Sequence, residues 1–104
     1  MAAPRFFVDD AAIEFKGKPR FHLMAATVPE LHAFCATAGI NRCWFHNTKG
    51  APHYDITAEQ REAAIALGAM PVRFREIRRR ALAANTPLAV NAQAELLLGG
   101  EGGE

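Results

Sequence analysis

The segment from Trp44 to Ile56 contains the side chains best suited to chemistry. It holds the only tryptophan and the only tyrosine of the chain, together with two of its four histidines. His46 ends an apolar run, a Lys-Gly-Ala-Pro turn follows, and His53 and Asp55 come just before a helix start. Binding and catalytic groups collect in loops between rigid elements. We therefore predict that the functional site lies in this segment.

His46, His53 and Asp55 suit either a divalent metal site or an acid/base set, and all three are predicted catalytic residues. Imidazole and carboxylate groups together suit zinc, manganese or iron, and a His-x-Asp pair in extended chain projects both side chains to one side. In an acid/base set, His53 would be the general base and Asp55 its orienting partner. The structural alternative is that His46 and Asp55 bind loop backbone while His53 stacks on Trp44. Because only six residues separate His46 from His53, we expect the three to line one pocket.

Four further residues are predicted to bind a ligand beside this trio. Asp9 follows a short strand, where a carboxylate can hold a hard cation in phosphoryl-transfer sites but can also simply end the strand. Trp44 or Tyr54 would form a wall of the pocket. Thr57 opens a helix whose free N–H groups favour anions.

His22 is the candidate that connectivity does not place. In a strictly parallel sheet it would lie at the opposite edge from His46. If the first two main strands pair antiparallel, His22 faces Asp9, but both then lie away from His46. A loop formed by residues 11–20 could fold over the sheet and join these groups.

Hydrophobic spacing and capping signals predict the elements that position these groups. Thr27 and Thr57 each open a capping-box sequence, and Gly39 and Gly68 supply the C-terminal stops. Two successive helix–glycine–strand units indicate an α/β layer with at least one parallel crossover, which would bring both helix N-termini to one edge. The predicted elements are strands at 5–8, 21–26, 42–46 and 70–74, a brief edge strand at 13–15, and helices at 28–38, 58–67 and 75–84.

The length of 104 residues predicts a single small domain of the α/β class, with a mixed sheet of about four strands flanked by helices. This domain would span residues 1–84, followed by a C-terminal helical extension at 85–98 and a disordered tail at 99–104. Leu96, Leu97 and Leu98 need a surface to pack against, either on the domain or on a second copy. A homodimer through this helix is therefore one expectation.

Composition and charge argue against several classes of protein. A formal net charge of +1 supplies no bulk field toward nucleic acid or membrane, and the Arg73–Arg80 run is interpreted as a solvated basic face. No apolar run approaches the ~18 residues of a membrane span, and the N-terminus lacks a signal-peptide pattern. Cys35 and Cys43 are interpreted as reduced thiols of a cytoplasmic protein. The glycine patterns of P-loop and dinucleotide-binding proteins do not occur.

Several short motifs occur in an order and spacing that resemble a known family. They are Val8-Asp9-Asp10, His22-Leu23-Met24-Ala25, Glu30-Leu31-His32, Trp44-Phe45-His46, His53-Tyr54-Asp55 and the Arg61…Ala64…Gly68-Ala69 helix end. Together they resemble the DUF4031 family, a group of small bacterial and phage proteins of unknown function. The resemblance covers roughly residues 6 to 80 and implies a shared signature made of Asp9, His22, His46, His53, Tyr54 and Asp55.

The leading functional hypothesis is a small hydrolase-like or nucleotide- or phosphate-handling protein. His46, His53 and Asp55 would act on a phosphate-bearing ligand held at the Thr27 and Thr57 helix N-termini, with a divalent metal as the candidate cofactor. The rival hypothesis is a non-catalytic binding or protein-interaction module that uses the same pocket. A third is a bacterial or phage accessory protein that works as a dimer.

Overall fold

A mixed sheet built mainly from antiparallel pairs organises the chain in the computed structural model, which describes residues 3–85. The strands pair in the order β4-β5-β3-β1-β6, with β2 pairing β3 at the side of this path, and only β1 and β6 run parallel. No helix in this part of the chain is both long and apolar enough to cross a membrane. The strands are β1 (Phe6–Val8), β2 (Ile13–Phe15), β3 (Lys18–Ala25), β4 (Phe45–His46), β5 (His53–Ile56) and β6 (Met70–Pro71); the helices are α1 (Val28–Thr37), the 3-10 turn η1 (Arg42–Trp44), α2 (Ala58–Ala66) and α3 (Phe74–Ala84).

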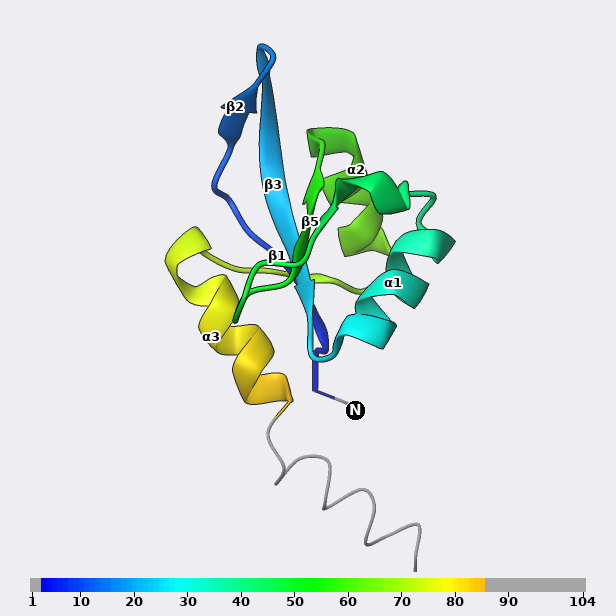
Figure 1. Cartoon of the computed structure of the whole chain (residues 1–104), viewed down its shortest axis with the longest axis vertical. Coiled ribbons are helices and arrows are strands. Elements are labelled where there is room, and N and C mark those ends of the chain that lie inside the picture. Colours follow the sequence, from blue (N-terminus) through cyan, green and yellow to red (C-terminus); the bar gives the residue numbers. More distant parts are fainter. Residues whose placement is uncertain (1–2, 86–104) are drawn as a thin grey trace, which may run out of the picture.

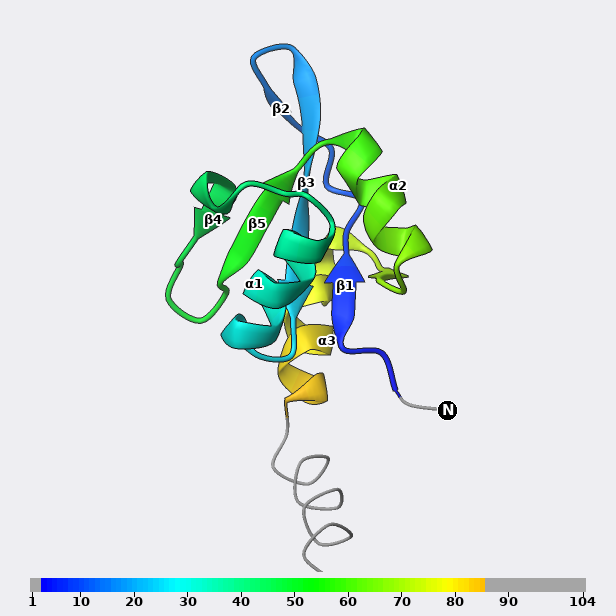
Figure 2. The same ribbon diagram turned by 90° about the vertical axis from the view of Figure 1, so that its right-hand side faces the viewer.

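The helices cover the two faces of the sheet unequally. Helices α1 and α2 lie on one side of the strands and α3 lies on the other (Figure 1). The β2–β3 hairpin extends beyond the helices at one end of the molecule, as both views show (Figures 1 and 2). This arrangement confirms the predicted α/β class and mixed sheet, although the sheet has six short strands rather than about four.

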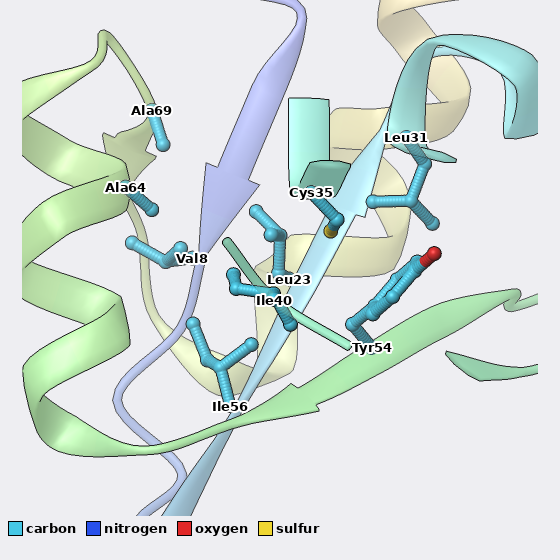
Figure 3. Packing of buried hydrophobic residues seen from close by; sticks show 9 residues of the cluster. All are labelled: Val8, Leu23, Leu31, Cys35, Ile40, Tyr54, Ile56, Ala64 and Ala69. Atoms are coloured by element: carbon cyan, nitrogen blue, oxygen red, sulfur yellow. The ribbon is translucent and has the colours of Figure 1, made fainter. Parts of the chain in front are cut away.

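Alternation along the strands divides the apolar residues between the two faces. The main core, on the side of α1 and α2, is formed by the buried residues Val8, Leu23, Leu31, Cys35, Ile40, Tyr54, Ile56, Ala64 and Ala69 (Figure 3). On the other face, Phe7 and Met24 pack with Ile77 and Ala81 of α3. Helix α3 therefore covers only part of this face, and the neighbouring part, formed by β3, β5 and β4, carries the side chains described below.

The two predicted capping boxes differ in detail. Thr57 and Gln60 form the complete reciprocal pair, at 2.9 and 3.1 Å. Thr27 accepts from the Glu30 backbone N–H, and its hydroxyl donates to the Glu30 carboxylate at 2.7 Å. The same carboxylate pairs with Arg5 at 2.6 and 2.9 Å and does not accept from the Thr27 backbone N–H. The hydrogen bonds from Arg5 lower the pKa of Glu30. Both helices begin where predicted, and Arg5 adds a link between the N-terminal segment and α1.

Five local predictions are wrong. Most of residues 11–20, predicted as a loop, forms the β2–β3 hairpin, and β3 begins at Lys18 rather than at Phe21. The 42–46 segment is a 3-10 turn followed by a two-residue strand, and the residues from His53 onward form a strand rather than a loop. The strand predicted to reach Phe74 ends at Pro71, since the Asp10 carboxylate accepts from the Phe74 N–H at 2.7 Å and α3 starts there. Leu67, predicted to face inward, is 50% exposed. The predicted extension at 85–98, with Leu96, Leu97 and Leu98, lies outside the described residues except for Asn85.

The antiparallel pairing also overturns the predicted shared helix edge. Strands β3 and β5 run in opposite directions, and each leads directly into a helix, β3 into α1 and β5 into α2. The N-termini of these helices, capped by Thr27 and Thr57, therefore lie at opposite ends of the strand pair. They cannot hold one small anion together.

The two cysteines are expected to differ sharply in reactivity. Both are free thiols; Cys43 is exposed, whereas Cys35 is buried in the core and burial raises its pKa to about 12. Since the thiolate is the reactive form, the native protein should show one fast thiol and one at least roughly a hundredfold slower. A titration with a disulfide reagent, repeated on Cys43→Ser, measures this difference. Two equally fast thiols in the folded protein would contradict the packing of Cys35.

Candidate metal centre

The register of three neighbouring strands brings four titratable side chains to one face of the sheet. His22 on β3 stands opposite Asp55 on β5, and His53 on β5 stands opposite His46 on β4. Alternation then places His53 and Asp55 on the same face, with Tyr54 between them pointing into the core. This face is the one that α3 covers only in part.

Asp55 is the centre of the cluster. His46 Nε2 lies 2.8 Å from Asp55 Oδ2, while His53 Nε2 and His22 Nε2 lie 3.5 and 3.9 Å from Asp55 Oδ1. The His22 and His53 rings meet edge to face at 4.8 Å, and the His46 and His53 rings stack at 5.4 Å. One ligand atom from each of His22, His53 and Asp55 can be chosen so that all lie within 4.8 Å of one another.

Asp9 hydrogen-bonds both the backbone of His22 and the Nδ1 side of its ring, while Nε2 faces Asp55. Its carboxylate is completely buried and accepts from the His22 backbone N–H at 2.8 Å, from the Ala11 N–H at 3.3 Å and from His22 Nδ1 at 2.6 Å. Arg61 donates to the Asp9 backbone carbonyl at 2.7 Å. The hydrogen bond to Asp9 raises the pKa of His22, although burial of the ring opposes this shift. Asp9 thus fixes both the ring and the backbone of its neighbour.

His53 is held in the same way by a backbone oxygen. Its Nδ1 lies 2.8 Å from the carbonyl oxygen of Ala51, which can only accept, so Nδ1 carries the proton. The loop before His53 is tied to α3, since Arg78 donates to the Gly50 carbonyl at 2.8 Å. Gly50 has a φ of +79°, and a Cβ there would lie 3.0 Å from the Arg78 guanidinium. The positive φ therefore favours glycine at this turn, and a larger residue would also displace the end of the Arg78 side chain.

These contacts determine where the remaining nitrogen lone pairs point. With Nδ1 of His22 and of His53 each directed at an oxygen acceptor, the neutral rings present unprotonated Nε2 atoms to Asp55. Two lone pairs and a carboxylate oxygen then converge with no donor between them. Such a cluster is stable when a cation, either a proton or a metal ion, lies among the three atoms.

The cluster lies in a pocket of about 440 Å³, within the usual range for small-molecule sites. One wall is aromatic and basic: the Arg20 guanidinium lies over the Trp44 ring at 4.1 Å and over the Phe15 ring at 5.7 Å. Near α3, Phe74 stacks on His22 at 5.6 Å. The pocket is lined by Ile13, Glu14, Phe15, Arg20, His22, Cys43, Trp44, His46, Thr48, His53 and Asp55.

The structure brings together His46, His53 and Asp55, adds His22, and places Trp44 in the wall. It separates Tyr54 from them: this side chain is 1% exposed and lies in the core (Figure 3), with its hydroxyl 2.8 Å from His32 Nδ1. Burial raises the pKa of Tyr54 and lowers that of His32, so a neutral hydroxyl donates to a neutral imidazole. The prediction of a tyrosine wall is wrong because neighbouring strand residues face opposite sides.

Thr57 and Asp9 do not line the pocket. The Thr57 hydroxyl accepts from Gln60 N–H as a helix cap, and Asp9 lies behind His22. The residues missed by the sequence reasoning are those of the hairpin, chiefly Phe15 and Arg20. A usable signal was present, because Arg20 is two residues before His22 on one strand and must share its face.

Comparison with known proteins identifies a family but no activity. A family model described as "Protein of unknown function (DUF4031)" matches residues 6–84, which is most of the chain and includes every residue of the cluster. No curated protein and no solved structure matched the chain in the other two comparisons.

Proposed function

The chain belongs to the DUF4031 family, and we propose that it is a metal-dependent, hydrolase-like protein whose divalent ion is held by His22, His53 and Asp55. The observation that carries this proposal is the pair of oxygen acceptors behind the two imidazoles, Asp9 for His22 and the Ala51 carbonyl for His53. Histidines that bind metals in proteins nearly always donate their other ring N–H to such an acceptor.

The spacing of the ligand atoms supports this assignment. Zinc–nitrogen and zinc–oxygen bonds of ~2.0–2.2 Å need ligand atoms roughly 3–4 Å apart. The separations of Asp55 Oδ1 from His53 Nε2 and His22 Nε2, 3.5 and 3.9 Å, lie in that range. Two imidazoles and one carboxylate are also a set that zinc uses in hydrolytic sites, with a further position for water or substrate. Small side-chain rotations complete the site.

His46 takes a different role in this proposal. It lies 2.8 Å from the Asp55 oxygen that faces away from His53, and it is about half exposed at the pocket. A bound zinc-class ion would lower the pKa of a coordinated water to about 7 and so supply a nucleophile. His46 is then placed to carry a proton between the reacting group and solvent, while its N–H orients Asp55.

The same geometry offers a metal-free alternative, in which a proton rather than a metal ion lies between the imidazoles and Asp55. The raised pKa of His22 supports this alternative, because the hydrogen bond to Asp9, together with the charge of Asp55, favours the protonated ring. A protein of this kind would be an acid/base site or the binding module that the sequence also allowed. The two proposals differ in one measurable property, the affinity for a divalent metal.

Titration of metal-free protein with cobalt(II) tests the proposal. We expect one ion per chain and visible absorption bands of a four- or five-coordinate site, without the sulfur charge-transfer band that Cys43 would produce. Zinc should displace the cobalt at one equivalent and raise the melting temperature, with the rise growing as the logarithm of the free zinc concentration. Six-coordinate cobalt with millimolar affinity, and no thermal shift with zinc or manganese, would reject the metal site and favour the protonated cluster.

A further inference from the structure

Arg20 is the one strongly basic side chain among the residues that line the pocket, and its surroundings hold it in place. It lies on β3 two residues before His22, so both side chains leave the same face of the strand about 6.6 Å apart. Its guanidinium lies 4.1 Å over Trp44, with Phe15 on the pocket wall 5.7 Å away. A guanidinium that stacks on aromatic faces keeps its N–H edges for other partners.

The edge of Arg20 has an unused donor. Its Nε is buried, and among the described residues it has no hydrogen-bond partner. A buried N–H without a partner costs free energy, so such a group in a native fold calls for an explanation. The two terminal nitrogens form a second edge of the guanidinium, and an oxyanion in the pocket could accept from both at once. A small rotation of the side chain would also bring Nε within reach of such an anion.

We propose that Arg20 is the residue that selects the substrate, and that the substrate is a small phosphate monoester. The proposal that a phosphate ester bond is broken rests on the proposed metal-dependent function. The proposal that Arg20 binds an anion does not depend on it. A phosphoryl group has three terminal oxygens, so one pair can accept from the Arg20 edge while the third faces the His22, His53 and Asp55 cluster. A carboxylate has only two oxygens, and the Arg20 edge would occupy both.

The reaction follows from this placement. The water oxygen bonds to phosphorus while His46 takes a water proton on Nδ1, the ester P–O bond breaks, and His46 passes this proton to the leaving oxygen. The products are an alcohol and inorganic phosphate, so no further reactant is required. The pocket of about 440 Å³ leaves space for an organic group beside Phe15 and Trp44.

Inorganic phosphate and metal-free protein test the recognition step alone. The only tryptophan of the chain, Trp44, lies against Arg20, so its fluorescence should report a saturable titration with phosphate. We expect Arg20→Gln and Arg20→Lys to weaken phosphate binding by about ten- to a hundredfold, the loss expected for a charge-assisted, two-point hydrogen bond. Because these changes also alter the tryptophan surroundings, the rise in melting temperature with phosphate, at matched ionic strength in chloride, serves as the second readout.

Arg80→Gln is the matched control. Arg80 also lies over an aromatic ring, Phe7 at 5.6 Å, but outside the pocket. We expect it to bind phosphate like the parent protein. With zinc present, we expect acetate to bind at least tenfold more weakly than phosphate, since it has no third oxygen for the occupied cluster. Equal phosphate affinity in the parent and in Arg20→Gln, or tighter binding of acetate than of phosphate, would overturn the proposal.

The metal titration separates the two proposals. Arg20→Gln should keep one zinc per chain, because Arg20 supplies no ligand to the cluster. If phosphate binding depends on Arg20 but no metal binds, the metal-dependent function fails while anion selection stands. If zinc binds tightly and phosphate affinity is the same with and without Arg20, anion selection fails and the metal site stands.

Discussion

Replacing His53 with alanine is expected to lower the affinity for zinc by roughly a hundredfold or more while the fold stays intact. The change removes one of three ligands, whereas replacement of partners that only support a ligand costs about ten- to a hundredfold. His53 lies at the sheet face rather than in the core, and its side chain bonds a backbone carbonyl of its own loop. Calorimetric titration with zinc, together with circular dichroism, measures both effects.

His32→Gln is the control for this variant. His32 is the one histidine of the four that lies outside the cluster, and glutamine can still accept from the Tyr54 hydroxyl. We expect its zinc affinity to equal that of the parent protein. If His53→Ala binds zinc as tightly as His32→Gln does, the cluster is not the metal site. If His53→Ala unfolds, the imidazole has a structural role that the geometry does not indicate.

Replacing Asp9 is expected to cause the largest loss of stability among the site variants. Asp9→Ala leaves the His22 backbone N–H and the imidazole N–H without their buried acceptor, at a cost of about 3–5 kcal/mol. For a domain of this size, this loss lowers the melting temperature by more than about 12 °C. Thermal and urea unfolding of the variant and the parent protein measure it.

Asp9→Asn separates packing from charge at the same position. The amide keeps the volume and one acceptor oxygen, so we expect a smaller loss, about 1–2 kcal/mol. It no longer favours the proton on His22 Nδ1, so zinc affinity should fall by roughly ten- to a hundredfold even though the protein folds. The neighbouring Asp10→Asn is the control, because Asp10 is exposed and only accepts from the Phe74 N–H. Equal zinc affinity in both variants would remove Asp9 from the site.

Local chemistry was sufficient to predict the helix starts and the class of fold. The Thr57–Gln60 cap and the turns at Gly39 and Gly68 depend on residues within a few positions of each other. Short-range patterns of this kind do not require knowledge of strand order.

The sequence also determined which residue types gather near His53, but not their partners. His53 and Asp55 are close because one residue separates them, and His46 is close because a short turn joins it to them. The same pattern was interpreted as a loop before a helix, since a four-residue strand with one apolar face carries little signal. For this reason Tyr54 was assigned to the pocket although it belongs to the core.

Only the tertiary structure decided that His22 and Asp9 join this site. The pairing of His22 with Asp55 is set by the register of β3 against β5, and that of Asp9 with His22 by β1 against β3. Register depends on which faces of distant strands become buried together, and a shift of one residue would turn every one of these side chains to the other face. Here the burial of Leu23, Tyr54 and Ile56 under α1 and α2 determines the register, and with it the convergence of His22, His53 and Asp55 on the opposite face.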